Sequence, residues 1–349
     1  MSQASIDVDP DFYTMEKTYG DDDWKSDTTS LASEIARGRV ENGRRYQSLK
    51  PGDYWSPSDD LQFEAYETGH IIYLLLDYNQ RNPLHRAPIE SPKHVLDVGT
   101  GKGSWAIDMA DMYPEATVRG VDLYPPPHTW IPPNCVFEVD DLLQPWTWNE
   151  KFDLIYLRHM LGSFRREEWA KLYDNCYENL EPGGWIEQFE FNIRVYSDDN
   201  SVPEDSILGQ WGDIWFPCSE RAGRPFGIEE TMRASLEKAG FVDIQEKVYK
   251  VPLGPWPRDP VLKELGLLHT HHWSTGLEGY CMLLLTKFGA PTPWKSEEVQ
   301  VFLAKTRAEL KDPKIHGYQF GRRIWARKPT EKEIKKESSD PPIKLEPST

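Results

Sequence analysis

Cysteine is scarce in this chain, with four residues in a total of 349. The four are far apart and include no Cys-x-x-Cys pair: Cys135, Cys176, Cys218 and Cys281. Widely spaced single cysteines exclude a disulfide framework and a zinc knuckle. We therefore expect no metal site, and a reduced protein of the cytoplasm, the nucleus or both.

Positive charge and long apolar runs are also in short supply. There are 40 lysines and arginines against 57 aspartates and glutamates, a formal net charge of -17. Since nucleic-acid binding relies on clustered positive charge, we expect none that is direct. The longest apolar run, "HIIYLLLDY" at 70–78, is far shorter than the roughly 20 residues of a membrane helix. The N-terminus lacks the features of a secretory signal, so we expect no membrane insertion.

Both ends of the chain are polar, whereas the middle is rich in aromatic residues, including many of the 14 tryptophans. Residues 1–28 are acidic without apolar periodicity, and residues 330–349 mix both charge signs with proline and serine. Such segments bury too little apolar surface to fold alone, so we predict two disordered tails. Flat aromatic side chains suit pockets and interfaces, which favours a binding function for the body.

Residues 29–90 are predicted to form an N-terminal helical extension. Leu31, Ile35 and Val40 lie roughly on one stripe, which indicates an amphipathic helix over 29–45. A second helical pattern occupies about 61–80 and ends before the proline-rich segment that follows.

The main body is predicted to span residues 91–329. From 94 to 191 short β-rich runs alternate with amphipathic helical patterns, which is typical of an open α/β sheet with mostly parallel strands and helices on both faces. Two further strands are expected near 241–254 and 316–329. Helical insertions are expected at about 197–235 and 255–312.

The stretch "HVLDVGTGKGSWAID" at 94–108 places Gly99, Gly101 and Gly103 between a strand and the start of a helix. Missing Cβ atoms let the backbone turn sharply and let a ligand approach the helix N-terminus. The spacing differs from the G-x-G-x-x-G pattern of dinucleotide enzymes. The glycines alone leave a purely structural turn open.

Carboxylates stand on three successive predicted strands. Asp122 ends the second strand, 19 residues beyond Gly103, where an acid can accept hydrogen bonds from both ribose hydroxyls. Asp140 and Asp141 end the third, where an adenine amino group could be read, and Asp97 in the first could fix the glycine loop or hold an ammonium group. Each alone is compatible with a solvated strand-end acid. Together they line the crevice where open α/β sheets bind ligands, which indicates a nucleoside.

These segments, with "FEVDDLLQPW", "FDLIYLRHMLGSF" and "LEPGGWIEQFEF", resemble the class I S-adenosylmethionine-dependent methyltransferases. More narrowly they resemble the fungal LaeA-like group, whose members regulate secondary metabolism and development or modify natural products. The likeness runs from about 41 to 329. It implies a Rossmann-like, seven-stranded α/β sheet with one antiparallel strand, N-terminal helices that cap the cofactor site, and insertions that act as helical lids.

The resemblance also implies a set of cofactor-binding residues. The glycine loop would hold the methionine portion of S-adenosylmethionine, Asp122 the ribose, and Asp140 or Asp141 the adenine edge, with Leu142 packed on the ring. The whole predicted set is Tyr46, Asp97, Gly99, Thr100, Gly101, Gly103, Asp122, Leu123, Asp140, Asp141, Leu142 and Arg158. One departure concerns the helix before His70, where the family usually has an Arg-Leu pair and this chain has Ala65 and Tyr66.

Methyl transfer needs a general base only when the acceptor is a poorly ionised hydroxyl or a protonated amine. His159 is the candidate base, because an ordinary histidine pKa near 6.5 suits proton removal at neutral pH. A histidine packed at a strand end is an equally compatible interpretation. Glu187 and Glu190 are alternatives, and strand alternation sends them to opposite faces of the sheet.

Two aromatic clusters have a structural and a functional interpretation. His269, His271 and His272 are predicted to be a solvated or capping cluster, with the lining of an acceptor pocket as the second choice. Trp211 and Trp215 share a helical face and are predicted to be core or interface. With Phe216 and Trp273 they would alternatively form a hydrophobic lid over the acceptor.

Three functions are compatible with these features. The first is a LaeA-like methyltransferase that regulates fungal development and secondary metabolism, in a complex with velvet-type proteins, other regulators or a second methyltransferase subunit. The second is an O- or N-methyltransferase that modifies a small metabolite. The third is a scaffold that binds the cofactor and has little activity.

Overall fold

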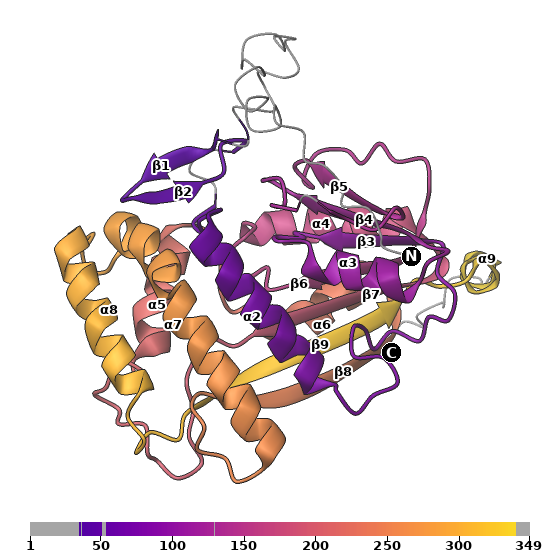
Figure 1. Ribbon diagram of the computed structural model, residues 1–349. Coiled ribbons are helices and arrows are strands. Elements are labelled where there is room, and N and C mark those ends of the chain that lie inside the picture. Colours follow the sequence, from indigo (N-terminus) through magenta and orange to yellow (C-terminus); the bar gives the residue numbers. More distant parts are fainter. Residues whose placement is uncertain (1–34, 36, 51–53, 129, 340–349) are drawn as a thin grey trace, which may run out of the picture.

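The protein is built around a seven-stranded sheet (Figure 1). The structure is a computed structural model and describes residues 35, 37–50, 54–128 and 130–339. The strands follow the order β5-β4-β3-β6-β7-β9-β8. Their bounds are β3 His94–Val98, β4 Thr117–Asp122, β5 Cys135–Val139, β6 Phe152–Arg158, β7 Leu180–Phe191, β8 Val242–Pro252 and β9 Tyr318–Arg327.

Strand direction confirms the predicted sheet. Strands β5, β4, β3, β6 and β7 pair in parallel, and β9 is antiparallel to both β7 and β8. The central strands β3 and β6 are almost wholly buried, as expected for parallel strands covered on both faces. The carboxyl ends of the five parallel strands therefore lie at one edge.

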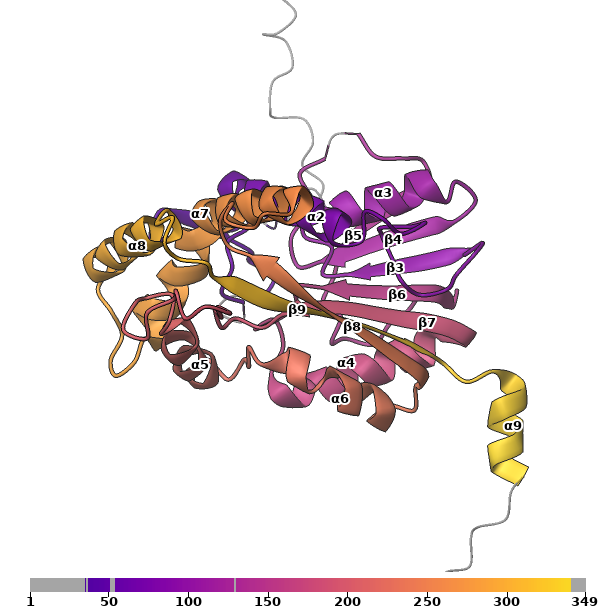
Figure 2. The same cartoon turned by 90° about the horizontal axis from the view of Figure 1, so that it is seen from below.

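Helices cover both faces of the sheet (Figure 2). Helices α2 (Asp60–Leu76), α3 (Ser104–Met112) and α7 (Pro260–Phe288) lie over one face, and α4 (Arg166–Asn179) and α6 (Met232–Lys238) lie under the other. Helices α5 (Trp211–Arg221) and α8 (Ser296–Leu310) pack against α7. None of the described helices is long and apolar enough to cross a membrane.

Trp211 and Trp215 belong to the hydrophobic core. The ring of Trp211 lies 4.7 Å from that of Trp273 and 6.0 Å from that of Phe302, between centroids. This cluster joins α5, α7 and α8. The core interpretation of the tryptophan pair is therefore confirmed over the lid, because both rings are buried and neither lines the pocket described below.

The helix predicted over 29–45 is wrong for the part that the structure describes from residue 39. Strands β1 (Arg39–Glu41) and β2 (Arg44–Tyr46) form an antiparallel hairpin there. Asn42 and Gly43 have φ of 50° and 75°, which the two-residue turns of hairpins require and which Asn-Gly adopts readily. Residues 29–34 lie outside the described residues.

The prediction of a disordered tail at 330–349 is also wrong in part. Residues Glu331–Ser339 form helix α9. Thr330 begins it, since its hydroxyl and its backbone N–H both donate to Glu333 Oε2 at 2.7 Å, and Arg327 pairs with the same carboxylate. This capping arrangement stabilises a short helix. Residues 340–349, like 1–28, lie outside the described residues.

Candidate functional site

A pocket opens at the carboxyl ends of β3, β4, β5 and β6. It is open to solvent, and residues of the glycine loop and of the segments that follow these strands line it. All the predicted site residues line it except Tyr46 and Asp97. Helices α2 and α7 and the segment before α2 close its other side with Lys50, Tyr54, Tyr66, Gly69, Tyr73 and His272, among others.

The three glycines of the loop have different structural roles. All have positive φ, at 68°, 57° and 91°, a region that favours glycine. A Cβ on Gly99 would lie 2.4 Å from Met160 Sδ, and one on Gly103 would lie 2.5 Å from the Phe137 ring. A Cβ on Gly101 would meet only the Tyr66 ring, at 3.6 Å. Gly99 and Gly103 therefore permit close packing, whereas Gly101 lines the pocket and a side chain there would make ordinary contact with Tyr66.

Asp97 lies beneath this loop instead of in the pocket wall. Its Oδ2 accepts a hydrogen bond from the Thr100 hydroxyl at 2.6 Å. Burial raises the pKa of Asp97 to about 6, because the charged form is costly away from water. Of its two predicted roles, the structure shows the first, which is to fix the glycine loop.

Asp122 joins the loop to the pocket. Its Oδ2 accepts a hydrogen bond from the Gly101 backbone N–H at 2.8 Å. Burial raises the pKa of Asp122, while the backbone amides of Gly101, Leu123 and Tyr124 oppose that shift. A carboxylate has about four acceptor positions, so Asp122 can brace the loop and still accept hydrogen bonds from a ligand.

The two acids after β5 differ in their surroundings. Asp140 is exposed and accepts a hydrogen bond from the backbone N–H of Asp141. Asp141 is largely buried and forms an ion pair with Lys50, 3.0 Å between Nζ and Oδ2. It also accepts from Gln144 and from the Leu143 backbone. Burial works to raise the pKa of Asp141, but these donors outweigh it and the pKa is lowered. Asp141 is therefore the better fixed of the two predicted adenine readers.

His159 lines the pocket but is a poor base. Burial, then neighbouring His272 and Arg158, lower the pKa of His159 to about 3. Its Nδ1 is buried with no hydrogen-bond partner among the described residues. The ring is therefore neutral at neutral pH, and a conjugate acid of so low a pKa gives little driving force for taking a proton.

His272 joins α7 to α2 across the pocket. Its Nδ1 is 2.7 Å from the Ala65 carbonyl oxygen, to which it donates, and its Nε2 accepts from the Tyr280 hydroxyl at 3.0 Å. Burial lowers the pKa of His272 to about 4. His269 is buried against Pro252 and His271 is exposed. The described residues contain no cluster suited to a metal ion.

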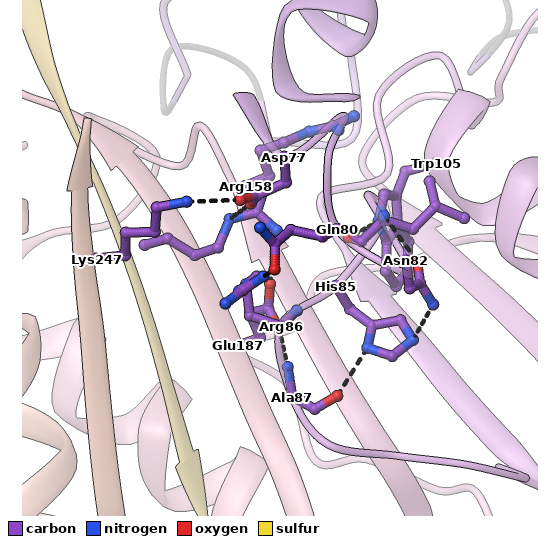
Figure 3. Close-up of polar contacts among 12 residues, drawn as sticks. Asp77, Gln80, Asn82, His85, Arg86, Ala87, Trp105, Arg158, Glu187 and Lys247 are labelled. Carbon is purple, nitrogen blue, oxygen red and sulfur yellow. Dashed lines mark hydrogen bonds and ion pairs between the residues drawn. The ribbon is translucent and has the colours of Figure 1, made fainter. Parts of the chain in front are cut away.

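Glu187 and Glu190 do not line the pocket. Glu187 accepts from the backbone amides of Arg86 and Ala87 (Figure 3) and pairs with buried Arg323 at 2.9 Å. Glu190 accepts from the backbone amides of Met160 and Leu161, at 3.0 and 3.2 Å. Glu187 therefore belongs to a structural ion pair, and Glu190 holds the loop after β6.

Tyr46 differs from its predicted place at the cofactor. It is fully buried, and the Arg39 guanidinium lies 4.7 Å from its ring centroid. Arg44 pairs with Asp59 through two hydrogen bonds of 2.7 and 2.8 Å. This hairpin thus anchors the start of α2. Residues that do line the pocket from this side, Lys50 and Tyr54, carry no motif that marks them in the sequence.

Known methyltransferases and regulators of secondary metabolism are similar to this chain. A family model described as "Methyltransferase domain" matches residues 70–246. The secondary metabolism regulator LAE1 of Cochliobolus heterostrophus is 39% identical, over 83% of this chain and 94% of that one. The methyltransferase pytC of Aspergillus terreus is 35% identical, over 84% and 89%. The protein-methionine methyltransferase laeA of Emericella nidulans is 32% identical, over 85% and 78%.

Solved structures match more distantly. The [4+2]-cyclase SpnF is 15% identical with a TM-score of 0.41, over 87% of this chain and 92% of that one. Phosphoethanolamine N-methyltransferase 2 of Haemonchus contortus, in complex with S-adenosyl-L-methionine, is 18% identical with a TM-score of 0.40, over 70% of this chain. The chain spans half the length of that enzyme's chain.

A seven-stranded sheet of this order, with a glycine loop and acids at the strand ends, defines an α/β enzyme that binds a nucleoside cofactor. The chain belongs to the methyltransferase family and, within it, to the LaeA-like group. As a member of this methyltransferase family, the chain uses S-adenosylmethionine as its cofactor. The residues of the pocket fit this cofactor, since Gly101 brings a backbone without a Cβ to the wall, and the carboxylates of Asp122 and Asp141 are among the lining residues.

Proposed function

We propose that this methyltransferase regulates secondary metabolism by methylating a protein at an atom that has no proton to lose. Relatives that cover most of the chain support the regulatory role: LAE1 is named a secondary metabolism regulator, and laeA of Emericella nidulans is named a protein-methionine methyltransferase. A methionine thioether takes a methyl group without losing a proton.

The chemistry of the pocket supports the same acceptor class. S-adenosylmethionine supplies a methyl group on a positively charged sulfur. On the side formed by α2, α7 and the end of β6, the titratable lining residues include Tyr66, His159 and His272. The two histidines have pKa values of about 3 and 4, and burial raises the pKa of Tyr66. These groups stay uncharged at neutral pH, and an amine or hydroxyl acceptor would need a better base.

The observation that carries the proposal is the burial of His159 beside His272, 6.2 Å between ring centroids. To test it, the chain is incubated with S-adenosylmethionine carrying an isotope-labelled methyl group and with an extract of its native cells. Mass spectrometry then locates the label. We expect it on a methionine sulfur of a protein.

A His159→Gln variant is the matched test of base catalysis. Because His159 takes no proton in this account, we expect the single-turnover rate to stay within about tenfold of wild type, whereas loss of a general base costs about 10²- to 10⁴-fold. A loss in that larger range would contradict the proposed acceptor class.

A second candidate function is methylation of a small metabolite. The similarity to the methyltransferase pytC, over 89% of that protein, favours it, as do the aromatic residues that line the pocket, Tyr54, Phe63 and Tyr66 among them. In the labelling experiment this function predicts label in the small-molecule fraction, on oxygen or nitrogen, and none in protein.

We further propose that the protein works with a regulatory partner, of velvet type or a second methyltransferase subunit, in the nucleus or the cytoplasm. The regulator names of several relatives support this proposal. Affinity purification from the native cell, with fractionation of nuclei, is its test. Recovery of the chain alone from both fractions would contradict it.

A further inference from the structure

Three side chains from three elements form a chain of contacts that begins at the pocket wall. His70 of α2 is buried, with 4% of its surface exposed. Its Nε2 lies 2.8 Å from Asp108 Oδ2 of α3, and its Nδ1 lies 3.1 Å from Nη1 of Arg158, the last residue of β6. Arg158 lines the pocket, whereas His70 and Asp108 stand behind it.

A single tautomer of His70 satisfies both contacts. A carboxylate only accepts hydrogen bonds and a guanidinium only donates them. His70 therefore carries its proton on Nε2, which donates to Asp108, and offers the lone pair of Nδ1 to Arg158. Burial lowers the pKa of His70, and Arg158 adds to that shift, so the ring is neutral and able to accept.

Arg158 is held without being neutralised. Its guanidinium lies 4.5 Å from the centroid of the Tyr73 ring, a cation–π contact, in addition to its bond to His70. Within the part of the chain that the structure describes, it makes no ion pair with a carboxylate. An uncharged acceptor and an aromatic face orient the cation but leave its positive charge for a ligand.

The charge of Arg158 is placed at the glycine-loop end of the pocket. It acts electrostatically on Asp97, which holds Thr100 of the loop. The methionine portion of S-adenosylmethionine ends in a carboxylate, and a planar guanidinium binds carboxylates with paired N–H groups.

We propose that Asp108 and His70 form a positioning relay, which fixes Arg158 for the carboxylate of the cofactor's methionine portion. His70 and Asp108 are positioning residues because they act through Arg158. The relay supplies a cation to this carboxylate from β6, in a chain that has Ala65 in α2 where the family usually has the arginine of an Arg-Leu pair. It goes beyond the proposed function, since it concerns the cofactor and applies to any acceptor.

The test compares two ligands that differ in the amino-acid end. S-adenosylhomocysteine carries the carboxylate, and 5′-methylthioadenosine has the same nucleoside thioether without it. Calorimetric titration gives the affinity of wild type, His70→Leu, His70→Asn and Arg158→Gln for each. We expect His70→Leu and Arg158→Gln to bind S-adenosylhomocysteine about tenfold more weakly. Binding of methylthioadenosine should change less than about twofold.

The conservative variant separates positioning from packing. His70→Asn keeps an acceptor oxygen near the place of Nδ1, so its affinity for S-adenosylhomocysteine should lie within about threefold of wild type. Asp108 is partly exposed, and Asp108→Ala, which removes the acceptor of His70 Nε2, serves as a folded variant of the relay if His70→Leu does not fold. The loss of affinity in this Asp108 variant should also be confined to S-adenosylhomocysteine.

Two results would overturn the relay. Equal losses of affinity for both ligands would show a general disturbance of the pocket, and wild-type affinity in His70→Leu and Asp108→Ala would show that the contacts do not position Arg158. If wild type binds neither ligand, the assignment of this pocket as the cofactor site is wrong. That outcome is distinct from a failure of the proposed acceptor, because no acceptor takes part in the titration.

Discussion

The carboxylate of Asp122 accepts a hydrogen bond from the backbone amide of Gly101, at 2.8 Å. This contact ties the end of β4 to the loop after β3, so the predicted ribose acceptor and the predicted cofactor loop form one unit. A substitution of Asp122 therefore acts on both parts of the pocket.

The first prediction separates these two effects. Asp122→Ala should weaken S-adenosylmethionine binding by about 1 to 3 kcal/mol, the range for a buried polar group that loses its partner. Asp122→Asn keeps a carbonyl oxygen for Gly101, so it should lose about half as much. Calorimetric titration measures both. Wild-type affinity in the two variants would contradict the ribose assignment.

A second prediction concerns the two acids after β5. Asp141 is fixed by Lys50, Gln144 and a backbone amide, whereas Asp140 is exposed. Asp141→Asn should therefore weaken cofactor binding about tenfold, and the matched Asp140→Asn should stay within about twofold. Calorimetric titration measures both affinities. A larger loss of affinity in Asp140→Asn than in Asp141→Asn would assign the adenine edge to Asp140.

Glu187 gives a prediction about stability. It pairs with Arg323, and both side chains are fully buried. Without Glu187, Arg323 keeps a longer ion pair of 3.5 Å with Asp77, and the backbone amides of Arg86 and Ala87 lose their acceptor. Glu187→Ala should therefore lower the free energy of unfolding by about 3 kcal/mol in urea titrations. Methyl transfer per folded molecule should be unchanged. A stable but inactive variant would show that Glu187 takes part in the reaction.

Glu229 gives a prediction about pH. Both of its carboxyl oxygens are buried and lack a hydrogen-bond partner among the described residues, and burial raises its pKa to about 8. The unfolded chain, with a pKa of 4.5 at this group, releases the proton first. The contribution of Glu229 to stability is therefore lost as the pH rises from about 4.5 through 8.

Glu229→Gln removes that dependence. At pH 8.5 the variant should be more stable than wild type by about 1 to 3 kcal/mol, and near pH 4.5 the two should be alike. Thermal unfolding across this range is the measurement. A variant less stable than wild type at pH 8.5 would show that the charged carboxylate has a partner in the folded protein.

The sheet and one wall of the pocket were predictable because they follow from local pattern and topology. Strands buried on both faces appear as apolar runs, and parallel strands bring their carboxyl ends to one edge. Asp122 and the loop of Gly101 therefore meet wherever this topology forms. The Asn42–Gly43 hairpin was equally visible as a local signal, and the helical spacing of Leu31, Ile35 and Val40 misled the prediction.

The other wall depends on tertiary packing that no short segment encodes. Helix α2 meets α7 where Gly69 lies under the His272 ring, 3.3 Å from an added Cβ. Tyr66 and His272 come together only through that contact. The low pKa of His159 likewise arises from burial beside His272. The ordinary pKa of histidine suggested that His159 acts as a base, and the burial of His159 in the fold argues against that role.

The role of the glycine loop as a wall of the S-adenosylmethionine pocket can be tested at Gly101. Gly101 has φ of 57° and lines the pocket, whereas Gly223, after α5, has φ of 69°, and no atom of the described residues lies within 4 Å of a Cβ added there. Alanine at either position strains the backbone similarly. Calorimetric titration of S-adenosylmethionine should show affinity at least about tenfold weaker in Gly101→Ala and within about twofold of wild type in Gly223→Ala. Equal affinity in all three proteins would show that the glycine loop does not contact the cofactor.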